Sequence, residues 1–233
     1  MNHFWNWVNP ENGEETRTLE LYGPIAEETW LNDEVTPEEF RKELNEGEGD
    51  VVILMNSPGG DCFAASRIYF MLNEYKQFKN SSITVKIEGM AASAASVVAM
   101  AGDSVQMAAP AMMVIHNPAT GAWGDRNVML KTADILDEVK ESIINAYELK
   151  TGLPRDKVWE MMESETWLSA RTAIELGFAD VMLGNSANKA FMFSNSVVER
   201  NITNKIAAKV QTENTGAKVS DLRNALYERL LKF

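Results

Sequence analysis

Gly89-Met-Ala-Ala-Ser93-Ala-Ala-Ser96, near the middle of the chain, places a serine among small residues directly after a β-rich run. Met113-Val-Ile-His116-Asn-Pro118 follows in the next segment. A serine hydroxyl is a poor nucleophile at neutral pH unless a neighbouring group takes its proton, and imidazole suits that role. The only other histidine, His3, lies near a polar terminus. The pattern therefore predicts Ser93 as a nucleophile and His116 as its base.

A glycine turn, Asn56-Ser-Pro-Gly59-Gly60, precedes this pair in the chain. Acyl transfer needs N–H donors that face the developing oxyanion, and glycine lets the backbone approach a substrate closely. We predict the N–H groups of Gly60 and Ala94 as these donors. The alternative is that Pro-Gly-Gly only turns a strand into the following helix.

Two other side chains compete for the role of nucleophile. Cys62 lies beside the glycine turn, and a thiol is intrinsically the better nucleophile. Nothing in the sequence directs it toward His116, however, and a lone cysteine is typically a small buried residue. Ser96 is expected to bond back to a carbonyl of its own helix. We therefore prefer Ser93.

Strand and helix patterns alternate along the chain, which predicts an α/β layered fold. The apolar run at 50–55 is typical of a strand buried on both faces, and the strand at 83–87 is expected to lead into a turn at Gly89. Predicted strands are residues 18–23, 50–55, 83–87, 105–107 and 112–115. Predicted helices are residues 36–46, 64–75, 91–101, 125–150 and 170–176, with a further helix opening at Pro154.

Composition changes toward Asn, Ser, Lys and Thr from Gly184, which indicates the end of the main domain. We expect an N-terminal segment over residues 1–17, a main domain over 18–184 and a polar tail over 185–233. The N-terminal segment is expected to be mobile, with Trp5 and Trp7 as anchors for a neighbouring subunit. Leucines four apart at 222, 226 and 230 predict a short amphipathic helix in the tail.

Charge and composition exclude several classes of function. The formal net charge of -12 disfavours nucleic acid as a partner, because such binding depends on Lys and Arg neutralising phosphates. The longest small-apolar run, 91–101, is too short for a membrane span. With Cys62 as its one cysteine the chain forms no internal disulfide, which suits a reducing cytoplasm. No cofactor, metal, nucleic acid or membrane partner is predicted.

The three motifs, at residues 56–60, 89–93 and 115–118, resemble those of the proteolytic subunit of Clp-type serine peptidases. Within that family they are most similar to the prophage-encoded branch associated with head maturation, and the resemblance covers residues 19–183. It implies a crotonase-like spiral of β-β-α units. The family's acid stands two residues before an aromatic in a segment ending Ser-Ala, which is the place of Glu165. Glu163 is the alternative acid, and both glutamates could instead belong to the solvated end of a helix.

The same resemblance implies a serine endopeptidase that cleaves polypeptides inside an oligomeric chamber. Its homo-oligomer would be stacked rings, heptameric or tetradecameric, with the helix at 125–150 packing ring against ring. Its partners would be protein or peptide substrates, an AAA+ unfoldase or phage capsid proteins in the bacterial cytoplasm. Because the chain has no nucleotide-binding loop, any ATP dependence would come from the partner.

Two alternatives of other classes remain open. One is a catalytically weak or inactive scaffold or shell component of the same fold, in which the Glu165 departure reflects lost activity. The other is a crotonase-like acyl-CoA enzyme, which is disfavoured because the acidic chain shows no basic cluster for the CoA phosphates.

Overall fold

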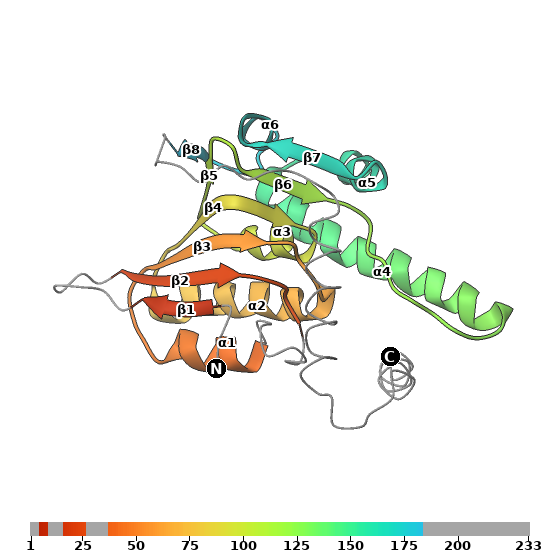
Figure 1. Cartoon of the computed structure of the whole chain (residues 1–233), viewed down its shortest axis with the longest axis horizontal. Helices are drawn as coiled ribbons and strands as arrows, with labels where there is room; N and C mark the ends of the chain where they lie inside the picture. The colour runs from red at the N-terminus through yellow and green to blue at the C-terminus, as the bar shows by residue number, and fades with distance from the viewer. Residues whose placement is uncertain (1–4, 9–15, 27–36, 184–233) are drawn as a thin grey trace, which may run out of the picture. The chain divides into compact units, whose positions relative to one another are not determined.

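The computed structural model describes residues 5–8, 16–26 and 37–183 (Figure 1). His3, the polar tail and its expected helix at 222–230 lie outside the described residues. One compact unit holds the described residues up to Asn117 and those from Glu141 onward, and a second holds Pro118–Lys140. The strands are β1 (Trp5–Val8), β2 (Arg17–Tyr22), β3 (Val51–Ser57), β4 (Ile83–Ala92), β5 (Ser104–Ala108), β6 (Met112–Ile115), β7 (Thr166–Ser169) and β8 (Val181–Leu183). The helices are α1 (Pro37–Asn45), α2 (Cys62–Lys79), α3 (Ala94–Ala99), α4 (Arg126–Thr151), α5 (Arg155–Glu163) and α6 (Ala170–Glu175).

The sheet branches at its longest strand, β4. Strand order is β1-β2-β3-β4-β5-β8, while β6 pairs with β4 and β7 pairs with β6. Residues 84–87 of β4 pair with β5, and residues 90–92 pair with β6. All of these pairings are parallel except β1 with β2 and β6 with β7. One strand therefore carries two branches of the sheet, β5 with β8 and β6 with β7.

The expected turn at Gly89 is wrong, because β4 continues through this residue to Ala92. A Cβ on Gly89 would lie 2.8 Å from the side-chain Oδ1 of Asn56 on the neighbouring strand. The glycine therefore makes room for a side chain of β3 instead of reversing the chain.

The core lies between the sheet and its helices, and Figure 1 shows α2 and α3 on one face of the sheet. Asp61 caps α2, and its carboxylate accepts the N–H groups of Phe63 and Ala64 at 2.8 Å. In β3 the burial alternates, with Val51, Ile53 and Met55 buried and the residues between them half-buried. The prediction that β3 is buried on both faces is therefore wrong, since its second face is only partly covered. Buried residues of α2 are Ala64, Ala65, Ile68, Met71, Leu72 and Tyr75.

The prediction of a mobile N-terminal segment is wrong for Trp5–Val8, which form β1 and pair antiparallel with β2. The guanidinium of Arg17 lies 4.0 Å from the centroid of the Trp7 ring, a cation–π contact. The same guanidinium donates to the carbonyls of Glu43 and Leu44 at the end of α1. The Trp7 ring thus packs against Arg17 of its own chain.

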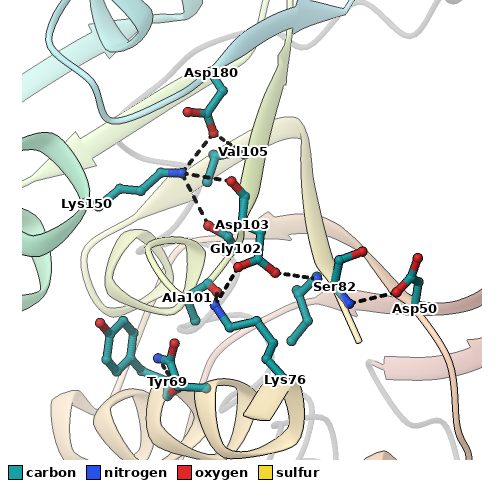
Figure 2. Close-up of polar contacts among 12 residues, drawn as sticks. Asp50, Tyr69, Lys76, Ser82, Ala101, Gly102, Asp103, Val105, Lys150 and Asp180 are labelled. Atoms are coloured by element: carbon teal, nitrogen blue, oxygen red, sulfur yellow. Dashed lines mark hydrogen bonds and ion pairs between the residues drawn. The ribbon is translucent and has the colours of Figure 1, made fainter. Parts of the chain in front are cut away.

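A polar network joins α2, α4, β5 and the start of β8 (Figure 2). Lys150 Nζ lies 2.9 Å from the carboxylate of Asp180, which also accepts the N–H of Val105 at 2.6 Å. Asp103 likewise binds Lys76 Nζ at 3.0 Å and the N–H of Ile83 at 2.8 Å.

None of the described helices combines the length and the apolar character that a membrane span requires.

Candidate active site

Four neighbouring strands bring the sequence-predicted site residues to one end of the sheet, where β3, β4 and β6 end and β7 begins. The glycine turn follows β3, Ser93 follows β4, and His116 follows β6. Because β7 runs antiparallel to β6, its first residue lies at the same edge, and Glu165 immediately precedes it. These strands pair in the order β3-β4-β6-β7. Residues separated by more than a hundred positions in the chain therefore converge on one place.

Ser93 has an unusual backbone conformation, with φ 54° and ψ −127°. A positive φ is uncommon for a residue that carries a Cβ. Its N–H donates to the carbonyl of Val114 on β6 at 2.9 Å. Ser93 is also the N-cap of α3, yet its side chain makes no capping hydrogen bond. The hydroxyl of Ser93 is therefore not consumed by the helix that it begins.

The glycine turn lies directly against this serine. A Cβ on Gly59 would lie 2.8 Å from Ser93 Cβ and 2.9 Å from the amide nitrogen of Ala94. Only a glycine allows this approach, and its φ of 89° is a second reason for glycine here.

The shape of the turn is set by the buried hydroxyl of Ser57, which accepts the Gly59 N–H at 3.1 Å and donates to the Gly23 carbonyl at 2.6 Å. Within the described part of the chain, the N–H groups of Gly60 and Ala94 have no acceptor. Two donors are thus left free on either side of the Gly59–Ser93 contact.

The imidazole of His116 is half-buried, and its Nδ1 lies 2.6 Å from the carbonyl oxygen of Asn117. A carbonyl oxygen only accepts, so Nδ1 carries a proton, and in the neutral imidazole Nε2 then has the lone pair. That tautomer is the one that a general base needs. Among the hydrogen bonds of the described residues, none joins His116 to Ser93 or to Glu165.

Glu165 is exposed, with φ 45°, and its Oε1 accepts the indole N–H of Trp167 at 3.1 Å. The register of β6 and β7 ends with Ile115 opposite Thr166, so His116 and Glu165 are the residues next to this pair, with Glu165 in the turn before β7. Glu163 ends α5 and has no such position. Sequence reasoning did not find β7, which is the element that puts Glu165 there.

The competing nucleophiles have other environments. Ser96 is buried, and its hydroxyl donates to the Ser93 carbonyl at 2.6 Å, which confirms the predicted bond back to a helix carbonyl. Burial, and secondarily the charge of Asp61, raise the pKa of the Cys62 thiol, which keeps it in the less reactive protonated form. Tyr147 lies within the helix expected at 125–150, and sequence reasoning missed its hydroxyl, which lies 2.8 Å from Ser96 Oγ.

The chain belongs to the Clp protease family, whose sequence profile matches residues 14–186. It is 33% identical over 136 residues to an ATP-dependent Clp protease proteolytic subunit from Bacteroides fragilis, an alignment that covers 58% of this chain and 64% of the relative. The chain thus spans less than two thirds of the length of that relative. To the subunit from Streptococcus salivarius it is 28% identical over 177 residues, covering 74% of this chain and 87% of the relative.

A solved structure of a ClpP1 mutant from Listeria monocytogenes has the same fold. Its TM-score is 0.60 with 22% sequence identity, and the alignment covers 72% of this chain and 92% of that one. The predicted Clp protease fold, a crotonase-like α/β spiral, is confirmed.

Proposed function

We propose that this chain is a serine endopeptidase in which Ser93 is the nucleophile, His116 the general base and Glu165 the acid that orients it. The observation that carries the proposal is the convergence of the glycine turn, Ser93, His116 and Glu165 at the ends of β3, β4, β6 and β7. The peptidase domain is taken as residues 18–184, between the N-terminal segment and the tail.

In the proposed reaction, Ser93 Oγ attacks the carbonyl carbon of a peptide bond while His116 Nε2 takes its proton. The N–H groups of Gly60 and Ala94 stabilise the oxyanion that forms. His116 then returns the proton to the leaving amine as the C–N bond breaks. A water molecule attacks the resulting acyl-enzyme by the same route, releasing the second product and restoring the Ser93 hydroxyl.

The hydrogen bonds of the triad form only after two side chains rotate. His116 Nε2 must approach Ser93, and the Glu165 carboxylate must leave the indole of Trp167. Catalytic hydrogen bonds often tighten only in the complex with substrate. Until then the Asn117 carbonyl keeps His116 in the required tautomer.

We further propose that the chain works as a homo-oligomer of stacked rings that encloses the site in a chamber. Large apolar side chains on α2, namely Phe63, Phe70 and Phe78, are mostly exposed in the single chain. The first half of α4 similarly exposes Val128, Met129, Leu130 and Ile135. Such surfaces are typical of association. Light scattering that gives the mass of a monomer would contradict the rings.

The finer proposal is a role in phage head maturation, with capsid, portal or scaffold proteins as substrates in the cytoplasm of a bacterial host. The alternative partner is an AAA+ unfoldase that delivers unfolded chains. This alternative is supported by the names of the relatives, which describe subunits of ATP-dependent Clp proteases. A second candidate function is an inactive scaffold of the same fold. The observation that favours it is that Glu165 binds Trp167 and makes no bond to His116.

Labelling with a fluorophosphonate, followed by intact-mass measurement, tests the proposal. We expect one adduct per chain in the wild-type protein and none in Ser93→Ala or His116→Ala. Ser66→Ala is the matched control, because it removes an exposed serine hydroxyl of α2 and should leave the adduct unchanged. Absence of an adduct on assembled wild-type protein would overturn the peptidase proposal and favour the scaffold.

A further inference from the structure

A chain of buried hydrogen bonds runs from α4 to the backbone of Ser93. Tyr147 Oη lies 2.8 Å from Ser96 Oγ, which in turn lies 2.6 Å from the carbonyl oxygen of Ser93. Because that carbonyl only accepts, Ser96 uses its proton on Ser93. Tyr147 must then be the donor to Ser96. The direction of all the protons in the chain is therefore determined.

Both side chains are held firmly in place. Tyr147 is 1% exposed and Ser96 is 0% exposed. The Tyr147 ring packs edge-on against Phe178, with ring centroids 5.5 Å apart and an interplanar angle of 62°. Burial raises the pKa of Tyr147, so the phenol stays protonated and remains a donor at neutral pH. The chain of hydrogen bonds thus persists throughout the range in which a histidine base works.

The receiving carbonyl belongs to the strained residue of the site. Ser93 keeps its positive φ because both sides of its backbone are tied, the N–H to Val114 and the carbonyl to the N–H and hydroxyl of Ser96. Sparsely populated conformations persist only where the surroundings over-determine them.

The carbonyl of Ser93 and the N–H of Ala94 belong to one planar peptide unit, so the orientation of one fixes that of the other. A peptide group whose oxygen accepts strong hydrogen bonds is polarised, which makes its N–H a better donor. From this geometry we infer that Tyr147 and Ser96 are positioning residues that aim and polarise the Ala94 N–H toward the oxyanion. The inference deepens the proposed function and rests on it.

The test compares three purified variants by the second-order rate of fluorophosphonate labelling at Ser93, each kept well below its unfolding temperature. Tyr147→Phe keeps the ring and removes one hydroxyl, and should slow labelling about three- to tenfold. Ser96→Ala removes the group that contacts Ser93 and should slow it by about tenfold or more. The double variant should be no slower than Ser96→Ala, since both hydroxyls act through one carbonyl.

Tyr75→Phe is the matched control. Tyr75 is also buried, at 2% exposed, and its hydroxyl donates to the backbone carbonyl of Gly49 at 2.8 Å and not to Ser96. It should lower stability as Tyr147→Phe does while leaving the labelling rate unchanged. Equal rates in Tyr147→Phe and wild type, or equal slowing in Tyr75→Phe, would overturn the inference.

A measurement that does not depend on activity separates this inference from the proposed function. The ¹⁵N chemical shift of Ala94 reports hydrogen bonding at the preceding carbonyl, and we expect it to move in Tyr147→Phe and Ser96→Ala but not in Tyr75→Phe. An unchanged shift in Ser96→Ala overturns the inference whatever the labelling shows. A wild-type protein that takes no label overturns the proposed function instead.

Discussion

His116 and Glu165 directly adjoin the last residue pair of β6 and β7, Ile115 with Thr166, His116 after Ile115 and Glu165 before Thr166. Each side chain nevertheless forms a hydrogen bond with a residue close to it in sequence, His116 with the Asn117 carbonyl and Glu165 with the Trp167 indole. The register therefore brings the proposed base and acid together through the backbone, while their side chains remain apart.

Glu165→Gln tests whether the Glu165 carboxylate assists His116. We expect labelling of Ser93 to slow by about 100-fold, because the imidazolium formed during acylation loses its carboxylate. This is less than the roughly 10⁴-fold loss in triads where the acid alone sets the tautomer, since the Asn117 carbonyl already favours the Nδ1–H tautomer before the triad forms. Glu163→Gln is the control and should label at the wild-type rate. If Glu165→Gln also labels at that rate, the Asn117 carbonyl suffices to orient the base.

Gly59→Ala should lower the stability of the protein and also prevent the labelling of Ser93. The new Cβ would lie 2.4 Å from the Ala92 carbonyl oxygen and would press on Ser93, at a backbone φ of 89°. We expect a loss of about 3 kcal/mol or more in unfolding free energy, measured in urea, together with loss of labelling. Gly152→Ala isolates the backbone component, because its φ is 69° and nothing lies within 4 Å of the new Cβ. It should cost only about 1–2 kcal/mol and leave labelling intact.

Cys62 should prove unreactive and dispensable for acylation. Its raised pKa predicts slow alkylation by iodoacetamide at pH 7.5 and faster alkylation as the pH rises. Cys62→Ala should take the fluorophosphonate at the wild-type rate. A variant that fails to label while still folded, judged by its thermal unfolding, would transfer the role of nucleophile from Ser93 to the thiol.

Asp180 should contribute to stability mainly through the N–H of Val105 (Figure 2). Asp180→Ala leaves that N–H without its acceptor and leaves Lys150 only the carbonyls of Gly102 and Asp103, and we expect it to lower the unfolding free energy in urea by about 1–3 kcal/mol. Asp180→Asn keeps an acceptor oxygen and should lose less. Lys42→Met removes an exposed ion pair with Glu46 and should change stability by less than about 0.5 kcal/mol. Equal losses in Asp180→Ala and Lys42→Met would contradict this ranking.

Tyr147 should make the protein sensitive to alkali. The folded state keeps its phenol neutral, whereas the unfolded chain ionises near the ordinary pKa of about 10. Above that pH the unfolded state binds fewer protons than the folded state. The contribution of Tyr147 to stability is therefore complete below about pH 10 and is lost as the pH rises further. Urea unfolding between pH 9 and 11 should therefore show a slope that is smaller in Tyr147→Phe, by up to about 1.4 kcal/mol per pH unit. Identical slopes would exclude Tyr147 as the source.

Long elements with a clear hydrophobic period were predicted well from the sequence. The helix expected at 125–150 is α4, Arg126–Thr151, and the helix expected at 170–176 is α6, Ala170–Glu175. The chemistry of the three motifs and their resemblance to the Clp family also pointed to the residues that lie at the ends of β3, β4 and β6.

Features that depend on tertiary contacts were not predictable in this way. β7 is four residues long with only Leu168 buried, which is too short to show a strand period. The Tyr147 hydroxyl has no local signature, since a tyrosine at helical spacing reads as an apolar contact. The Asn117 bond to His116 depends on a ring orientation that sequence does not encode.

The glycine turn and Glu165 are separated by most of the described chain, and the site needs both. During synthesis the N-terminal part of a chain emerges first, so Ser93 and His116 exist for some time without β7 and its glutamate. A growing chain therefore carries the nucleophile before it carries the full triad. Under the proposed mechanism, a triad built from distant segments would become active only once the sheet has closed, and an incomplete chain would not yet cleave its neighbours.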